Sequence, residues 1–408
     1  MIDDIASDVR AQAVPSTDGR RARAGFWLVA AVCTLVMLGG TLPIPLYALW
    51  APRMGFGPFT TTLVFAVYAL GTVLALMVFA SLSDRAGRRP LLAAAVLAAA
   101  TSTALFLLAD DVGTLLAARF LCGLGTGIFT ATATAALGEL AGAEHTRRVS
   151  TVSTAANMGG LGLGTVVAGL FAQYGANPTH LVFWTYLASL VPAFLAVIVT
   201  PETVTARQRP AMSVRRPTLP DGRAARPEFL RAATAVLAAF AVGGLFSSLV
   251  PSFLHEQLHV HNVAAVGAEV GLLFIVALIA QVAAPERWIS GRRPASAFLV
   301  AGVVVFEAGL WTRSLTTFVA GTLLAGTGIG LAFRRGVGVA QRLADPRRRA
   351  DQLSTYFLFA YTGTIVPTLA LGLLDQTINQ DVATLILAVA VVATTLVSAL
   401  SRPTTAIA

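Results

Sequence analysis

Long apolar runs and short polar breaks alternate along the chain, and this alternation sets the expected architecture. Each of twelve runs is close to the ~20 apolar residues that a helix needs to cross a bilayer. The first six runs cover residues of about 26–50, 60–81, 91–108, 114–137, 150–172 and 181–200. The other six cover about 229–252, 264–284, 296–312, 317–341, 353–374 and 382–401. The pattern predicts an all-α polytopic membrane protein with twelve transmembrane helices.

A proline- and arginine-rich segment separates the two sets of six runs, and its composition suits neither a membrane span nor a packed core. We therefore expect an N-terminal tail, a six-helix half, a linker, a second six-helix half and a C-terminal tail. Their expected bounds are 1–25, 26–200, 201–228, 229–401 and 402–408. Within the first run, Pro43 and Pro45 are expected to bend the helix near its outer end.

The composition excludes a soluble globule, because 56% of the 408 residues are hydrophobic and only 12% are charged. All basic residues are arginines, and 26 of the 29 fall in the tails, the linker and alternate loops on one side of the expected membrane. Arginine-rich loops stay in the cytoplasm. Both termini are therefore expected to be cytoplasmic, in a multi-pass protein of the cell (inner) membrane. The net charge of +9 is accounted for in this way without nucleic acid as a partner.

The two halves contain a weak internal repeat. The segment from Arg119 to Gly127 in the fourth run aligns with the segment from Thr322 to Gly330 in the tenth, so that three glycines coincide in each. Degenerate duplication of this kind is typical of transporters in which two pseudo-symmetric halves enclose a site near the middle of the membrane.

The break between the second and third runs carries an unusual group of charges around a glycine, namely Asp84, Arg85, Gly87, Arg88 and Arg89. Their order resembles the loop between helices 2 and 3 of major facilitator superfamily transporters, whose pattern reads G-x-L-a-D-R-x-G-R-[RK]. The leading glycine of that pattern is Ala80 here. The resemblance covers about residues 25–400 and implies alternating access between the two halves, in the branch of bacterial drug or metabolite:proton antiporters.

The resemblance also implies that the charged hairpin forms a network that clamps helix 2 to the start of helix 11 and stabilises the outward-facing state. Expected partners are Glu139, at the end of the fourth run, and the arginines at positions 347–349. The alternative is a loop that only holds the orientation by its positive charge.

Arg119 lies about five residues inside an apolar run, where a charge is costly and usually faces a polar interior. Its surroundings resemble the helix-4 pattern of the same family, R-x-x-[Q]-G-x-G, with Cys122 in place of the glutamine. The resemblance implies a role in proton coupling. The alternative is an arginine that extends to the outer headgroups.

The fifth run is rich in glycine, and it resembles the antiporter signature g-x-x-x-G-P-x-x-G-G from Gly160 onward. Thr165 replaces the proline and Ala168 replaces a glycine, which weakens the inference of export. Small residues also allow helices to approach closely, and packing explains the run equally well. The glycines expected to serve helix packing are Gly123, Gly127, Gly160 and Gly164.

Two carboxyls lie inside runs of the second half, Glu269 and Glu307. A carboxyl in an apolar span can bind and release a proton, and Glu269 is the stronger candidate because helix 9, which carries Glu307, is peripheral in this fold. Arg334 and Arg335 are candidates for the substrate cavity, with lipid contact as the alternative. Further candidate lining residues, for which packing is an equal alternative, are Tyr47, Tyr68, Asn157, Tyr356 and Tyr361.

Other chemistry is not indicated. His255, His259 and His261 are interpreted as part of a solvated outer loop rather than a metal site, and the chain has no nucleotide-binding loop. We expect no cofactor and no enzymatic activity. The predicted function is proton-coupled efflux of a small apolar or amphipathic compound by a monomer in the lipid bilayer. The alternatives are proton-coupled uptake of a small organic anion, and a sensor or scaffold without transport.

Overall fold

The computed structural model describes residues 19–142, 145–204, 217–345 and 348–400, which form helices and connecting loops with no strand among them. The first half begins with α2 (Gly19–Thr41), the short 3-10 helix η1 (Ile44–Leu46) and α3 (Tyr47–Met54). It continues with α4 (Pro58–Val78), α5 (Ala80–Ala86), α6 (Arg88–Leu107), α7 (Val112–Ala141), α8 (Thr146–Tyr174) and α9 (Leu181–Val199).

The second half begins with α10 (Ala225–Ser252), the short π-helix η3 (Phe253–Gln257) and α11 (Val263–Ala283). It continues with α12 (Glu286–Ser290), α13 (Arg292–Thr312), α14 (Leu315–Leu343), α15 (Arg349–Leu374) and α16 (Gln380–Leu400). Counting α2 to α3 as one span, the described residues contain twelve helices long and apolar enough to cross a membrane. The predicted all-helical fold with twelve spans is confirmed.

The first span is broken where the two prolines were expected to bend it. Helix α2 ends at Thr41, Pro43 precedes η1, and Pro45 lies inside η1. Proline has no N–H to donate and cannot continue a regular helix. The break places Tyr47 at the start of α3, where its side chain is buried.

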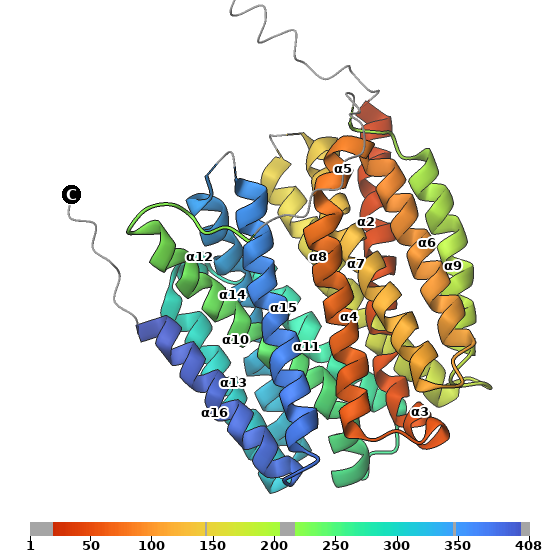
Figure 1. Cartoon of the computed structure of the whole chain (residues 1–408), viewed down its shortest axis with the longest axis vertical. Helices are drawn as coiled ribbons and strands as arrows, with labels where there is room; N and C mark the ends of the chain where they lie inside the picture. Colours follow the sequence, from red (N-terminus) through yellow and green to blue (C-terminus); the bar gives the residue numbers. More distant parts are fainter. Residues whose placement is uncertain (1–18, 143–144, 205–216, 346–347, 401–408) are drawn as a thin grey trace, which may run out of the picture.

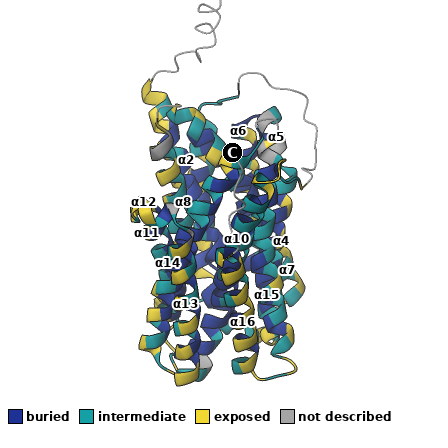
Figure 2. Ribbon diagram, turned by 90° about the vertical axis from the view of Figure 1, so that its left-hand side faces the viewer, coloured by how far each residue is buried: buried dark blue, intermediate teal, exposed yellow. Residues whose placement is uncertain are grey.

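The two halves lie side by side, the first on the right and the second on the left in Figure 1. We call the end of the bundle that carries α5 and α12 the hairpin end, and the opposite end the far end. Exposed residues, yellow in Figure 2, lie along the outer sides of the bundle, and many of them are large and apolar. On α9 and α16 they include Trp184, Leu195, Val389 and Leu400. Such a surface suits contact with lipid.

Helices of the two halves pack in two pairs, α4 against α15 and α8 against α11. At the far end of the second pair, the backbone N–H of Val263 donates to Oε1 of Gln173 at 2.8 Å, and a Cβ on Gly169 would lie 2.7 Å from the carbonyl oxygen of Val263. At the far end of the first pair, a Cβ on Gly372 would lie 3.1 Å from Cα of Phe59. The halves are therefore in close contact at the far end.

The internal repeat is visible in the packing within each half. A Cβ on Gly127 of α7 would collide with the carbonyl oxygen of Thr72 on α4, and a Cβ on its counterpart in the repeat, Gly330 of α14, would collide with that of Ala277 on α11. Helices α7 and α14 thus approach equivalent neighbours in their own halves. The aligned glycines permit this approach because any side chain would collide with the backbone.

Candidate functional site

Gly87 separates α5 from α6 at the hairpin end and has a φ of 107°, which only glycine adopts readily. Directly beyond it, the carboxylate of Glu202 accepts hydrogen bonds from the backbone N–H groups of Arg88, at 2.9 Å, and Arg89, at 3.2 Å. These N–H groups begin α6 and have no partner within the helix. Glu202 therefore caps α6 from the segment that follows α9, and its negative charge lies at the positive end of the helix dipole.

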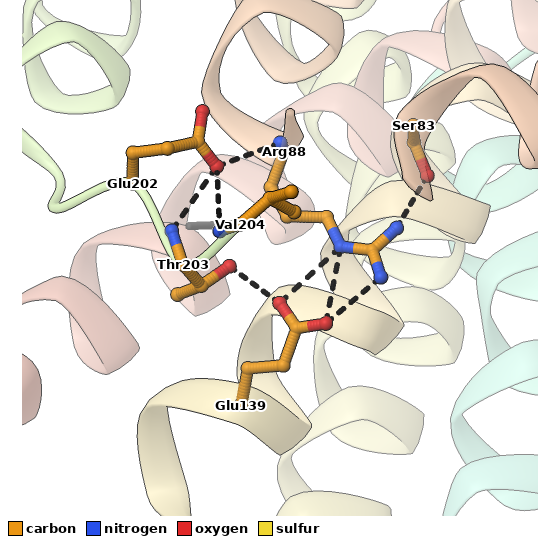
Figure 3. Close-up of polar contacts among 6 residues, drawn as sticks. All are labelled: Ser83, Arg88, Glu139, Glu202, Thr203 and Val204. Carbon is orange, nitrogen blue, oxygen red and sulfur yellow. Dashed lines mark hydrogen bonds and ion pairs between the residues drawn. The ribbon is translucent and has the colours of Figure 1, made fainter. Parts of the chain in front are cut away.

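The Arg88 side chain turns inward from the same turn and forms an ion pair with Glu139 near the end of α7 (Figure 3). Nη2 lies 2.8 Å from Oε1 of Glu139, and Nε donates to both carboxylate oxygens. Nη1 donates to Oγ of Ser83 on α5 at 2.6 Å. The hydroxyl of Thr203 also donates to Glu139. The guanidinium thus joins α6 to α5 and α7, and Glu139 links this group to the segment after α9 through Thr203, all in the first half.

The sequence predicted a charged network here, and the structure brings together Arg88 and Glu139 from it. The side chain of Asp84 lies outside the described residues, as do those of Arg347 and Arg349, so the expected clamp to the start of helix 11 stays a prediction. Arg85 lies in the last turn of α5. Sequence reasoning missed Glu202. Its signal was an acid directly after Pro201, where the sixth apolar run ends.

Arg119 of α7 is fully buried in the first half, so the alternative that it extends to the headgroups is wrong. Its Nη1 donates to the carbonyl oxygen of Gly40 on α2 at 2.8 Å. Its Cζ lies 4.7 Å from the ring centroid of Tyr68 and 5.6 Å from that of Tyr47, within the range of cation–π attraction. Among the described residues, Nε and Nη2 have no hydrogen-bond partner. Tyr47 and Tyr68, two of the four tyrosines expected to line a cavity, therefore lie beside this guanidinium.

Glu269 of α11 is buried, with 8% of its surface exposed. Its Oε1 lies 2.6 Å from Oγ1 of Thr322 on α14. The same hydroxyl lies 3.1 Å from the carbonyl oxygen of Phe318, one turn earlier. No ion pair to Glu269 occurs within the described ranges. Thr322 is the residue that the repeat aligns with Arg119, so Glu269 lies beside the position in the second half that corresponds to Arg119 in the first.

Glu307 of α13 has a similar environment in the outer layer of the second half. It is also 8% exposed, and its Oε2 lies 3.4 Å from Oγ1 of Thr384 on α16. That hydroxyl lies 3.0 Å from the carbonyl oxygen of Asp381. The two carboxyls differ in position, because α11 packs against α8 of the first half, whereas α13 packs against α14 and α16.

The two adjacent arginines of α14 lie beside other residues of the second half. Arg334 donates to the carbonyl oxygen of Gln281 and pairs with Glu286 of α12 at 2.9 Å. Arg335 lines a cavity with Arg231 of α10. Neither residue is in contact with Arg119 or Glu269 in the hydrogen bonds and ion pairs that the structure describes.

The remaining candidates for cavity lining have different surroundings. Tyr356 is fully buried in an apolar cluster with Phe229. The ring of Tyr361 meets Phe240 edge-on, at 5.8 Å between centroids. Nδ2 of Asn157 lies 3.2 Å from the sulfur of Met37.

The four glycines expected to serve packing lie at close helix contacts. Gly123 and Gly127 of α7 face α4, and Gly160 and Gly164 of α8 face α2. A Cβ on Gly160 would lie 2.5 Å from the carbonyl oxygen of Thr34. No cluster of three potential metal ligands occurs among the described residues.

Comparison with known proteins gives a family and a set of similar folds. The model of the Major Facilitator Superfamily matches residues 29–366. No curated protein sequence matches the chain. A human organic anion transporter, MFSD10 (TETRAN), is 17% identical, with a TM-score of 0.65 over 92% of this chain and 99% of that one.

Two further solved structures have the same fold. A bacterial homologue of the human lysosomal transporter Spinster, in an inward-facing and occupied conformation, is 17% identical, with a TM-score of 0.67 over 92% of this chain and 94% of that one. The nucleoside transporter NupG is 11% identical, with a TM-score of 0.70 over 92% of this chain and 98% of that one.

Proposed function

Because the chain belongs to the Major Facilitator Superfamily, we propose that it is a secondary active transporter that exports a small apolar or amphipathic compound in exchange for protons. It works in the cell membrane with both termini in the cytoplasm, so the hairpin end faces the cytoplasm. The arginine bias supports this orientation, since 26 of the 29 arginines fall in the tails, the linker and the loops on the side of the hairpin.

The contact between Glu269 and Thr322 is the observation that carries the proposal of proton coupling. A hydroxyl has one proton to donate and can also accept. When Glu269 is ionised, Thr322 donates to its Oε1 at 2.6 Å. When Glu269 is protonated, the carboxyl donates to Thr322, whose own proton turns to the carbonyl oxygen of Phe318 at 3.1 Å. Rotation of the Thr322 hydroxyl therefore lets the carboxyl of Glu269 keep a hydrogen bond in both of its protonation states.

Position favours Glu269 over Glu307 as the proton carrier. A buried charge without a paired cation is costly, so each carboxyl gains from binding a proton. Only Glu269 lies on a helix that packs against the other half. Movement of α11 relative to α8 would therefore change the hydration of Glu269, which couples its protonation to alternating access.

An aromatic row in the second half supports a substrate with apolar or aromatic groups. Phe240 of α10 stacks on Phe333 of α14 at 5.8 Å, and Phe333 meets Phe357 of α15 at 6.3 Å between centroids. Phe240 also meets Tyr361 edge-on. All four side chains are only partly buried. Partly buried aromatic side chains with one hydroxyl are suited to an amphipathic ligand.

Proteoliposomes with an imposed pH gradient provide the test. The purified protein should drive uphill movement of an amphipathic cationic dye in response to the gradient. Glu269→Gln should abolish uphill movement and retain downhill exchange, whereas Glu307→Gln, the matched control, should retain both. Uphill transport by Glu269→Gln at the normal rate would exclude this carboxyl, and no flux of any compound in a broad screen would favour the sensor or scaffold.

Transport of a small organic anion is a second candidate, and Arg119 is the observation that favours it. A fully buried guanidinium gains from a negative partner, and Nε and Nη2 have none among the described residues. An anionic substrate would supply that partner. Counterflow of carboxylate compounds tests this candidate. It is supported over the first if the counterflow is lost in Arg119→Gln and if excess amphipathic dye does not inhibit it.

A further inference from the structure

Helix α11 of the second half is capped at its start by a side chain of the first half. Asn262 precedes the helix, and its Oδ1 accepts from the backbone N–H of Ala265 at 3.1 Å. The N–H of Val263, the first residue of α11, donates instead to Oε1 of Gln173 near the end of α8, at 2.8 Å. N–H groups in the first turn of a helix have no partner within it. Gln173 therefore completes, from the other half, the cap that Asn262 begins.

The cap lies at the end of a contact in which the two backbones meet. A Cβ on Gly169, one turn before Gln173 on α8, would lie 3.1 Å from Cα of Ala264. A Cβ on Gly267, one turn into α11, would collide with the carbonyl oxygen of Thr165. The spacing of four residues places Thr165, Gly169 and Gln173 on one face of α8. The hydrogen bond from Val263 therefore requires α8 and α11 to be in contact up to their far ends.

Both partners of this hydrogen bond are able to return to water. Gln173 is exposed and Val263 is half-buried. When the halves separate at the far end, the carboxamide and the N–H exchange each other for water, so neither is left buried without a partner. The net gain from such a hydrogen bond is small. It favours a closed far end without preventing its opening, as a transport cycle requires.

The other contact between the halves is of a different kind. A Cβ on Gly372 of α15 would collide with the hydroxyl of Thr62 on α4. That hydroxyl donates to the carbonyl oxygen of Phe59 in its own helix at 2.8 Å. Close packing, and not a hydrogen bond from Thr62 to the other half, joins α4 to α15 at this place. Thr62 therefore lies at the closed far end without taking part in the cap of α11.

We propose that Gln173 is a positioning residue of the transport cycle, which caps α11 across the interface and so favours the state that is closed at the far end. The inference rests on the proposed function, because it gives Gln173 a part in alternating access. Glu269 lies on the same helix, six residues after Val263 and about 9 Å further along its axis. Gln173 therefore acts through the part of α11 that leads to the proposed proton carrier.

The test measures how often the far end opens. Thr62 is only 3% exposed where α4 meets α15, so a cysteine at this position reacts with a water-soluble maleimide when the far end is open. The rate of modification of Thr62→Cys is measured by mass spectrometry on the purified full-length chain in detergent, and it is proportional to the open fraction. A hydrogen bond contributes about fivefold to such an equilibrium, so the addition of Gln173→Ala should raise the rate about fivefold.

Gln173→Glu changes the cap in the opposite direction. At neutral pH the carboxylate accepts a stronger, charge-assisted hydrogen bond, and its negative charge lies at the positive end of the α11 dipole. This variant should lower the rate of modification about fivefold. It keeps the length of the side chain, so it provides the comparison with wild type even if Gln173→Ala does not fold. Rates that change in the same direction in both variants, or in neither, would overturn the proposal.

The matched control is Asn379→Ala, which also removes an amide oxygen from the start of a helix at the far end. Oδ1 of Asn379 accepts from the backbone N–H of Val382 in α16 at 2.9 Å, within the second half. This variant should leave the rate unchanged, and a rise equal to that in Gln173→Ala would overturn the proposal in favour of general loosening. The assay uses neither a pH gradient nor a substrate. A loss of proton-coupled flux would therefore refute the proposed function without changing this result.

Discussion

Arg119 and Gly40 join α7 to α2 by one hydrogen bond, in which Nη1 of the buried guanidinium donates to the main-chain carbonyl oxygen at 2.8 Å. Gly40 lies in the last turn of α2, three residues before Pro43, where the first span breaks. A carbonyl near a helix end has no partner within the helix and can accept from a side chain. The prolines of the first span and the arginine of the fourth are therefore parts of one arrangement.

Arg119→Lys should reduce the transport rate about tenfold or more. Lysine keeps the charge but loses the planar fork that reaches Gly40 while lying over the Tyr68 ring. The initial rate of dye transport in proteoliposomes is the measurement. Arg53→Lys is the control, because Arg53 is exposed and donates only to Thr179 among the described residues. A normal rate in Arg119→Lys would mean that charge alone suffices.

Gly87→Ala should destabilise the protein by about 1–3 kcal/mol, which is typical of strained backbone conformations. The substitution combines an unfavourable φ of 107° with a Cβ only 2.5 Å from Oε2 of Glu202. Gly142→Ala is a matched control. Its φ is 78° and its ψ is 159°, near the values of 107° and 154° at Gly87, but a Cβ there would meet nothing within 4 Å. Equal losses of Tm in the two variants would show that contact with Glu202 is unimportant.

The sequence predicted the spans because bilayer thickness and helix geometry fix the length of an apolar run. It also placed Arg119 in the interior, since a charge within such a run is costly. It could not identify Glu202 as the cap of α6, because that contact joins segments 114 residues apart. In the same way, the partners of Arg334 depend on which direction this face of α14 points. The length of an apolar run does not predict that direction.

The cap of α7 should make stability depend on pH. Hydrogen bonds from the hydroxyl and the backbone N–H of Thr114 lower the pKa of Asp111 below its usual value of 3.8. The stabilisation is therefore fully present above pH 3.8 and is lost as the pH falls through the lower folded value. The Tm difference between wild type and Asp111→Asn should shrink across this range. Ser314→Ala removes an uncharged cap from α14. It should therefore lower Tm by the same amount above and below this pH range.

Topology can be tested with cysteines placed at the two ends of the bundle. Asp221→Cys lies in the exposed linker at the hairpin end, and Ala176→Cys in an exposed loop at the far end. The native Cys33 and Cys122 are buried and should remain unmodified. In intact cells an impermeant maleimide should label Ala176→Cys only, and both sites should be labelled after lysis. Labelling of Asp221→Cys alone in intact cells would reverse the orientation.

Alternating access requires the far end to open, and a cross-link between α4 and α15 should prevent this. A Cβ on Gly372 would lie 3.1 Å from Cβ of Thr62, close to the separation of ~3.5–4.5 Å in disulfides. The pair Thr62→Cys with Gly372→Cys should therefore stop transport on oxidation and recover it on reduction.

The control is Gly302→Cys with Ala325→Cys, which would join α13 to α14 within the second half, where a Cβ on Gly302 would lie 2.9 Å from Cβ of Ala325. That cross-link leaves the contact between the halves unchanged, so transport should continue whether it is oxidised or reduced. Transport rates are to be compared with the extent of cross-linking measured by mass spectrometry. A fully cross-linked Thr62–Gly372 pair that still transports would show that the far end does not have to open between α4 and α15.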